Sequence, residues 1–488
     1  MVFSSLFFLC VFLPACLLCC FARGGLSWRN GALIVFSLIF YAWGEPVVVF
    51  LMLATVAVNY AAALLIDRGN RNRQSDELTS RDGTQKRGAL QKVALVAAAT
   101  FDIGMLLVFK YSGFLVETFN ALTSLKLPVP EIALPIGISF YTFQILSYLA
   151  DVYRGETEAQ TSFPKLLLYV SLFPQLVAGP IVRYSHIARE IGERTTNFED
   201  MCAGIERFAV GLAKKAVLAN TCGSLSITYM DPAHFDSLSV AGAWFGLLMY
   251  TLQIYFDFSA YSDMAIGMGH MLGFHYRENF RYPYISQSVT EFWRRWHISL
   301  SSFFRDYVYI PLGGGRRHRI RNLFIVWALT GLWHGASWNF VLWGLWYFIF
   351  IVLEKQVLCR IPAAVPRVFR HMYLMLVVML GWVLFYFTDL RETVVFLGKL
   401  FGVGANGFID MGLRIELMNN VFFILFALFA CIRIIGIPKT IYEYFSRKGS
   451  NWARAAFALK YVAVGGLLLI SAVMLAGNSY NPFIYFRF

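Results

Sequence analysis

Residues Leu323 to Leu353 read LFIVWALTGLWHGASWNFVLWGLWYFIFIVL, a run of 31 residues without one formal charge. As a single straight helix this run would be about 46 Å long, whereas the hydrocarbon core of a bilayer is roughly 30 Å thick. We therefore expect the run to cross a membrane with a bend or break. Thr330-Gly331 and Gly335-Ala336-Ser337 are the places where the sequence favours one.

The rest of the chain has the composition of a membrane protein. Of its 488 residues, 58% are hydrophobic and only 15% are charged, and the mean hydropathy is +0.58. A soluble domain carries about 25% charged residues. Other apolar runs near spanning length lie at residues 2–22, 31–43, 46–66, 93–109, 134–150, 205–221, 239–256, 370–388, 418–437 and 456–476. We predict an all-α polytopic membrane protein, with residues 1–488 forming a single membrane-embedded domain.

The net charge of +13 indicates how the chain is oriented. Residues 44–46 (GEP) separate two apolar runs, and the resulting hairpin places Arg23 and Arg29 on the same side as a basic loop at 67–92. By the positive-inside rule this side is the cytoplasm, so we expect residues 2–22 to be a retained first helix with its N-terminus outside. Basic residues confined to short loops argue against nucleic-acid binding.

Three segments are too irregular or too polar for simple spans. Leu172 to Val182 (LFPQLVAGPIV) contains two prolines and a glycine, which predicts a re-entrant or unwound segment. Residues 286–306 have helical periodicity with an apolar stripe of Phe292, Trp296, Leu300 and Phe303, which predicts one interfacial amphipathic helix. Three glycines at 313–315 then lead into a flexible, basic loop with Arg316, Arg317 and Arg319.

His334 is the first candidate for chemistry. An ionisable side chain in an apolar span is costly and marks a reaction site or pathway, unless it is a neutral histidine bonded to a neighbouring helix. Gly331 and Gly335 would let a substrate or another backbone approach, and imidazole suits proton removal near neutral pH. His297, at the border of the amphipathic stripe, would point to the core or remain in interfacial packing.

A polar stretch follows the apolar run at 239–256 and reads YFDFSAYSD from Tyr255 to Asp263. Asp257 and Asp263 with the interleaved Tyr261 suggest a hydrogen-bonded cavity wall. The structural alternative is helix capping or ion pairing with Arg294 or Arg295. Neither the histidines nor the eight cysteines have zinc-site spacing, so we expect no metal, and no nucleotide-binding or nucleophile-elbow motif is present.

Several of these stretches resemble the membrane-bound O-acyltransferase (MBOAT) family, in particular its bacterial polysaccharide branch of AlgI, PatA and, more distantly, DltB types. The matching motifs are MVFSS at 1–5, LPIGISFYTF at 134–143, DVYRG at 151–155, AGPI at 178–181, YFDFSAYSDMA at 255–265, residues 279–284, EFWRRWHISL at 291–300, RDY at 305–307, GLWHGA at 331–336 and NPFIYF at 481–486. These motifs occur in the order typical of the family, and together they span most of the chain.

The resemblance implies a fold of about eleven spanning helices, with re-entrant and interfacial helices around a central funnel. It implies that His334 is the catalytic histidine and His297 the second motif histidine. By the same resemblance, the polar motif residues are expected to bind substrate: Asp257, Tyr261, Asp263, Trp296, Arg305 and Trp333. Arg316, Arg317 and Arg319 are candidates for the phosphates of a coenzyme A donor, although the positive-inside rule explains them equally well.

The expected activity is transfer of an acetyl group from cytoplasmic acetyl-CoA, across a bacterial inner membrane, to an exported polysaccharide such as alginate. The implied partners are a periplasmic SGNH-type acetyltransferase, the polysaccharide acceptor and the lipid bilayer. Three rivals remain open at this point. They are peptidoglycan as the acceptor, a lipid or protein acceptor, and a transporter that moves the acyl donor without chemistry.

Overall fold

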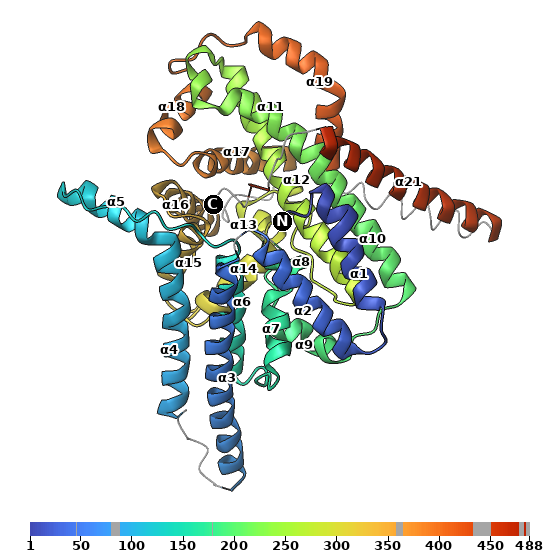
Figure 1. The fold of residues 1–488 in the computed structure, drawn as a ribbon. Coiled ribbons are helices and arrows are strands. Elements are labelled where there is room, and N and C mark those ends of the chain that lie inside the picture. The colour runs from blue at the N-terminus through green and yellow to red at the C-terminus, as the bar shows by residue number, and fades with distance from the viewer. Residues whose placement is uncertain are drawn as a thin grey trace. The chain divides into compact units, whose positions relative to one another are not determined.

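The computed structural model describes residues 1–44, 46–79, 88–177, 179–357, 365–432, 450–477 and 483–484. Every regular element in these residues is helical (Figure 1), which confirms the all-α prediction. The chain forms two compact units, Met1–Ile205 with Ala265–Arg277, and Glu206–Met264 with Glu278–Phe488. The single membrane-embedded domain and the count of about eleven spans stay predictions.

The first unit begins with a series of apolar helices. Its elements are η1 (Phe8–Phe12), α1 (Leu13–Phe21), α2 (Leu26–Ala42), α3 (Val48–Thr79), α4 (Ala89–Leu106), η2 (Leu107–Tyr111), α5 (Ser112–Thr123), α6 (Ile138–Arg154), α7 (Phe163–Ser171), α8 (Phe173–Leu176) and α9 (Tyr184–Glu193). Helix α10 (Phe198–Ala213) starts in this unit and ends in the second, and the last turns of α12 (Val240–Leu272) return to it. Helices α3 and α4 lie side by side as a hairpin (Figure 1).

The predicted loop at 67–92 was wrong in its bounds, because α3 continues to Thr79 and α4 already begins at Ala89. Beyond its apolar part, α3 carries polar side chains that form an ion pair and a hydrogen bond. Arg71 pairs with Asp67 one turn earlier at 2.8 Å, and the Asn70 side chain donates to the carbonyl of Val152 at 2.8 Å. Hydrophobic periodicity does not indicate this extension, because the residues of α3 after Ile66 are mostly polar. Residues 80–87 lie outside the described residues.

The second unit contains the remaining helices. They are η3 (Lys214–Ala219), α11 (Asn220–Met230), η4 (Pro232–Ser237), most of α12, η5 (Pro283–Ile285), α13 (Val289–Arg295), α14 (Ile298–Phe304), η6 (Arg305–Tyr309), α15 (Arg319–His334), α16 (Trp338–Gln356), α17 (Arg367–Tyr386), α18 (Leu390–Leu400), α19 (Met411–Ala430) and α21 (Ser450–Gly477). Its core is unusually aromatic, with fully buried Trp343, Trp382 and Tyr347.

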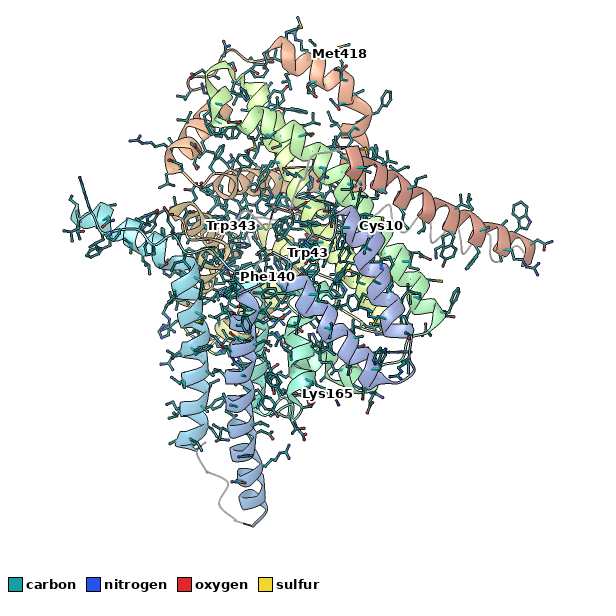
Figure 2. The ribbon with its side chains drawn as sticks, viewed as in Figure 1. Cys10, Trp43, Phe140, Lys165, Trp343 and Met418 are labelled. Atoms are coloured by element: carbon teal, nitrogen blue, oxygen red, sulfur yellow. The ribbon has the colours of Figure 1, made fainter. Side chains whose placement is uncertain are left out.

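Six of the described helical segments are long and apolar enough to cross a membrane: Val48–Asn72, Ala89–Thr123, Trp338–Gln356, Arg367–Tyr386, Met411–Ala430 and Asn451–Gly477. Apolar side chains on these helices are widely exposed. Met418 of α19, labelled in Figure 2, is 78% exposed, and Phe422 is 85% exposed. Such surfaces suit lipid and not water, so the protein is a multi-pass membrane protein.

The long apolar run breaks at Gly335-Ala336-Ser337, one of its two expected places, whereas Thr330 and Gly331 lie within a continuous helix. Helix α15 ends at His334, α16 begins at Trp338, and the two lie side by side (Figure 1). Two glycines allow the close approach: a Cβ on Gly331 would lie 2.4 Å from the carbonyl oxygen of Phe340, and one on Gly344 would lie 2.3 Å from that of Trp327. The glycines therefore admit another backbone, which was one of the two alternatives.

The segment at 172–182 is broken as expected. Helix α7 ends at Ser171, the four-residue α8 follows, and no helix resumes before Tyr184. Most of its described residues are buried, including Phe173 and Leu176. Buried irregular backbone of this kind is tolerated at membrane depth only where protein or a cavity surrounds it. Ala178 lies outside the described residues.

The single amphipathic helix predicted for 286–306 was wrong, because two short helices, α13 and α14, occupy the segment. The break falls at His297, whose φ of +43° lies in the left-handed region. The stripe itself is confirmed as a core face, since Phe292, Trp296, Leu300 and Phe303 are all buried. Hydrophobic periodicity detects the apolar face of the segment. It does not detect the left-handed backbone at His297, because the apolar face continues on both sides of it.

Candidate active site

His334 is the last residue of α15 and lies at the break of the long apolar run. It is buried, with 7% of its surface exposed. Three aromatic rings surround it nearly edge-on: Trp333 and Trp343, each with ring centroids 4.8 Å away, and Phe385 at 5.1 Å. The imidazole is thus surrounded by aromatic side chains, an environment of low polarity in which hydrogen bonds are strong.

His297 is held in its strained conformation by Asn279. The Asn279 carbonyl accepts the N–H of Ile298 at 3.0 Å, and its side-chain oxygen accepts the N–H of Ser299 at 3.0 Å and the Ser299 hydroxyl at 2.9 Å. That hydroxyl lies 3.5 Å from His297 Nδ1. A left-handed non-glycine residue fixed by its surroundings is a frequent property of functional sites.

The two histidines share a neighbour. The Trp333 ring lies 5.9 Å from the His297 ring and 4.8 Å from the His334 ring, in both cases near perpendicular. His297 is only 2% exposed, and this burial lowers its pKa to about 3. It therefore stays neutral at physiological pH and can donate or accept a hydrogen bond. Of the two positions that we left open for His297, the structure selects the core.

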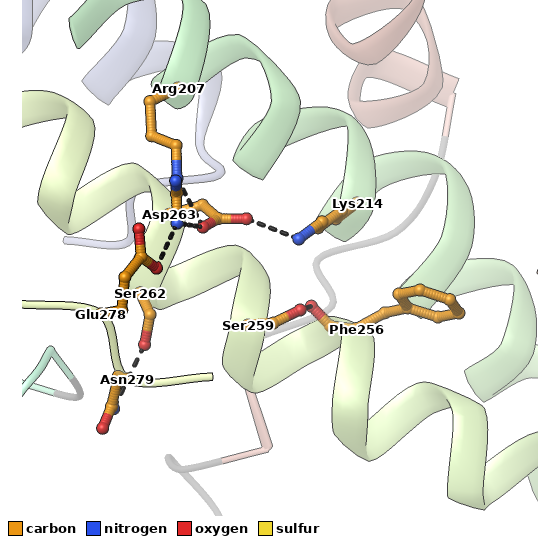
Figure 3. Close-up of polar contacts among 8 residues, drawn as sticks. All are labelled: Arg207, Lys214, Phe256, Ser259, Ser262, Asp263, Glu278 and Asn279. Atoms are coloured by element: carbon orange, nitrogen blue, oxygen red, sulfur yellow. Dashed lines mark hydrogen bonds and ion pairs between the residues drawn. The ribbon is translucent and has the colours of Figure 1, made fainter. Parts of the chain in front are cut away.

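Asp263 lies inside α12, which continues to Leu272 instead of ending before the polar stretch (Figure 3). One carboxylate oxygen accepts from Arg207, 2.6 Å from Nη2, and the other from Lys214 at 2.6 Å. Arg207 also pairs with Glu278 at 2.7 Å. Next to Asp263, the Ser262 hydroxyl accepts from the Asn279 side chain at 3.3 Å, which links α12 to the clamp on His297.

Asp257 anchors the end of the chain. Its carboxylate accepts from Lys215 at 2.6 Å and from the backbone N–H of Ile484 at 2.7 Å, and Lys215 and Asp257 are both almost fully buried. Tyr261 is also buried and packs edge-on against Phe483, with ring centroids 5.1 Å apart. These contacts favour the structural alternative for the carboxylates, with partners other than the Arg294 or Arg295 that we expected. Their substrate roles stay predictions.

The predicted arginines lie at the surface. Arg305 pairs with Asp306 through two bonds of 2.6 and 3.0 Å. Arg316, Arg317 and Arg319 are exposed. Their loop is shaped by one buried side chain, Asn322, which donates to the carbonyls of Leu312, Gly314 and Arg317 at 2.7–3.1 Å. These three bonds hold the backbone of the loop, and its expected flexibility stays a prediction.

The indole N–H of Trp343, whose ring packs against His334, is buried and has no hydrogen-bond partner among the described residues. The same holds for the Trp293 indole N–H and the Tyr347 hydroxyl, whose rings pack against Trp343. Trp343, labelled in Figure 2, is fully buried, and its ring centroid lies 5.6 Å from that of Trp293 and 5.2 Å from that of Tyr347. Leaving a buried donor unpaired costs about 1–3 kcal/mol. Such a cluster requires an explanation, and a bound polar group supplies one.

Sequence reasoning named Trp333 and Trp296 but missed Trp293, Trp343, Tyr347 and the Asn279 clamp. Trp296 itself is packed among aromatic rings, with Trp382 at 5.0 Å and Phe280 at 5.1 Å. For Trp343 and Tyr347, the available signal was the recurrence of indole and phenol groups inside a run without formal charge. Asn279 belongs to a quoted motif, but nothing in its spacing indicates that it fixes the backbone at His297.

Comparison with known proteins decides the family. A sequence model described as MBOAT, membrane-bound O-acyltransferase family, matches residues 154–396. "Probable alginate O-acetylase AlgI" of Pseudomonas putida is 35% identical over the full length of both chains. The chain belongs to the membrane-bound O-acyltransferase family. The family resemblance of the motifs is confirmed, and the protein is an acyltransferase.

Two further relatives extend the similarity to other acyl-transfer proteins. Helicobacter pylori peptidoglycan O-acetyltransferase is 28% identical, and the alignment covers 93% of this chain and 91% of the relative. The Bacillus subtilis teichoic acid D-alanyltransferase is 27% identical over 44% of this chain and 57% of its own. The rival of a transporter without chemistry is set aside, because the family and these relatives are named for acyl transfer.

Proposed function

We propose that this MBOAT protein takes an acetyl group from acetyl-CoA at the cytoplasmic face of a bacterial inner membrane and passes it outward for O-acetylation of an exported polysaccharide, alginate-type in the first instance. The full-length similarity to AlgI-type proteins supports the acceptor class. The burial of His334 against Trp343, whose indole N–H has no partner among the described residues, is the observation that carries the chemistry.

His334 acts as the general base. Its imidazole takes the proton of an attacking hydroxyl while the hydroxyl oxygen bonds to the acetyl carbonyl carbon. The carbonyl electrons move onto oxygen and return as the carbon–sulfur bond breaks. Coenzyme A leaves as a thiolate and receives the proton from the imidazolium. The attacking hydroxyl belongs to the polysaccharide or to a serine of a periplasmic SGNH-type partner.

The surrounding side chains provide polar contacts to the reacting carbonyl. His297, neutral at physiological pH, is suited to position the acyl group through a hydrogen bond. The Trp343 N–H and the Tyr347 hydroxyl are donors available to the developing oxyanion, and buried donors of this kind are worth about 10²–10³ in rate. Trp333, in contact with both histidines, shapes the wall between them.

The donor's phosphates are assigned to the basic loop. Arg316, Arg317 and Arg319 lie on exposed backbone fixed by Asn322, and guanidinium groups suit phosphate recognition. The N-terminus is assigned to the outside by the positive-inside rule, because Arg23 and Arg29 follow the first apolar run.

A His334→Gln variant tests the base directly. Glutamine keeps polarity and approximate size but cannot take a proton, so polymer acetyl esters should fall by about 10²–10⁴-fold. Acetate released by mild alkali from the purified polymer measures this loss. The matched control is His234→Gln at an exposed histidine, which should leave acetylation unchanged. Wild-type acetylation in the His334 variant would refute the assignment.

Peptidoglycan is the second candidate acceptor, favoured by the near full-length match to the Helicobacter pylori peptidoglycan O-acetyltransferase. A strain that lacks the gene distinguishes the two candidate acceptors. If alginate-type polymer is the acceptor, its acetyl content falls and the muropeptides keep theirs. The reverse pattern assigns peptidoglycan.

A further inference from the structure

The first unit contains a cluster of metal-binding side chains that acyl transfer does not use. Asp200 lies in the first turn of α10, His270 in the last turn of α12, and His275 three residues beyond the end of α12. One potential ligand atom from each lies within 4.8 Å of the other two. The two imidazole rings are nearly perpendicular, with centroids 4.9 Å apart.

The backbone after α12 brings the histidines together. Gly273 adopts φ +85°, and the N–H of Phe274 returns to the carbonyl of Gly269 at 2.8 Å. A side chain is strained in this left-handed conformation, which glycine adopts freely. The resulting turn folds His275 back over His270. Two segments about 70 residues apart in sequence therefore supply the ligands, one with Asp200 and the other with both histidines, which is why their spacing gave no sign of a metal site.

Glu190 of α9 orients His275. One of its carboxylate oxygens lies 2.8 Å from His275 Nδ1, and the other accepts the backbone N–H of His275 at 3.1 Å. A carboxylate on one ring nitrogen is the arrangement that fixes a metal-binding histidine, because it leaves the lone pair on the other nitrogen free for the ion. That other nitrogen, Nε2, faces Asp200.

The separations fit a small transition-metal ion. His275 Nε2 lies 3.5 Å from Asp200 Oδ1, and His270 Nδ1 lies 3.9 Å from the same oxygen. Zinc bound tetrahedrally at about 2.0–2.1 Å separates its ligand atoms by roughly 3.3 Å. All three ligand atoms lie within 4.8 Å of one another, so side-chain shifts of about 1 Å or less complete the geometry. The His275 side chain is 47% exposed, so an ion can reach the cluster from water.

We propose that Asp200, His270 and His275 bind one divalent ion of the Zn²⁺ class, with Glu190 as the hydrogen-bond partner of His275. Two imidazoles and a carboxylate favour Zn²⁺ over Mg²⁺ or Ca²⁺, which prefer oxygen ligands. The ion ties α9, α10 and the end of α12 together, so its role is to stabilise the fold. The competing explanation is a protonated His275 that pairs with Glu190 and Asp200 without any metal.

The test uses the full chain purified in detergent, with any affinity tag removed and the protein treated with a chelator. Isothermal titration with Zn²⁺ should show one ion per chain, and Co²⁺ should give the visible absorption of a tetrahedral nitrogen–oxygen site. The His270→Ala and His275→Ala variants should lose this binding. Glu190→Gln should weaken it by about 10–100-fold. His234→Ala, at an exposed histidine, is the matched control and should bind as the wild type does.

Two results would overturn the proposal. One is the absence of saturable Zn²⁺ binding by the wild-type protein, which needs no variant and supports the metal-free ion pair. The other is binding of wild-type affinity and stoichiometry in the His270→Ala or His275→Ala variants. Because metal content is measured and not acyl transfer, either result leaves the proposed catalytic role of His334 untouched.

Discussion

At the scale of single residues, the proposed base His334 packs against Trp343, whose indole N–H has no partner among the described residues. Trp343 shows the difference between a packing and a catalytic role most clearly. Its ring fills the core between His334 and Trp382, with centroid distances of 4.8 and 6.3 Å, while its N–H is unused. Packing requires the ring alone, so the N–H can be tested separately.

Trp343→Phe removes the N–H and retains an aromatic ring. If this N–H stabilises the oxyanion, the maximal acyl-transfer rate should fall by about 10²–10³-fold, measured with labelled acetyl-CoA. The control is Trp346→Phe on the same helix, whose N–H already donates to the Val377 carbonyl at 2.9 Å. That variant should lose stability and retain the rate. Equal rates in the wild type and Trp343→Phe would exclude the donor role.

His297 makes stability depend on pH. Its pKa is about 3 in the folded protein because of burial, against about 6.5 when unfolded. The unfolded chain therefore binds a proton first as the pH falls. The stabilisation of the folded state by neutral His297 is complete above about pH 6.5 and is lost progressively as the pH falls to about 3.

The His297→Asn variant checks this dependence. Asparagine tolerates the left-handed backbone but does not titrate, so the thermal unfolding midpoint should fall less between pH 6.5 and pH 5 than in the wild type. Since the comparison is between two proteins in the same detergent, other titrating groups cancel. Parallel curves for the two proteins would contradict the buried, neutral state of His297.

At the scale of elements, the sequence predicts where helices break better than it predicts which distant residues contact each other. The break before Trp338 and the irregular segment at 172–182 follow from glycine and proline, whose backbone preferences are local. The break at His297 was missed because it depends on Asn279, 18 residues away in sequence. The partner of Asp257, Lys215, was missed for the same reason, since no periodicity links positions 42 residues apart.

Gly344→Ala should separate α15 from α16. Its Cβ would lie 2.3 Å from the Trp327 carbonyl oxygen, a backbone atom that cannot rotate away. Overpacking of this kind costs about 1–3 kcal/mol, so the unfolding midpoint should drop. Gly465→Ala in α21, where nothing lies within 4 Å of an added Cβ, is the control and should be neutral or stabilising. Equal stability of the two variants would contradict the close contact.

At the scale of the whole molecule, hydropathy and motif order predicted a polytopic all-α MBOAT protein, and the family match confirms it. The reason is that burial in lipid leaves its mark on nearly every span, and short motifs keep their order along the chain. The ends of helices were less predictable, because α3 and α12 both continue past their apolar segments into stretches whose charged residues form ion pairs. The pairing of His297 and His334 through Trp333 depends on the tertiary fold, which no local pattern contains.

The central claim is that His334 removes the proton of the attacking hydroxyl. Its most direct test is a single-turnover measurement with purified protein in proteoliposomes, labelled acetyl-CoA and an added polysaccharide or partner serine as the acceptor. Wild type should transfer the label, whereas His334→Gln should bind acetyl-CoA with unchanged affinity and transfer it about 10²–10⁴-fold more slowly. Equal transfer rates for the two proteins would contradict the mechanism.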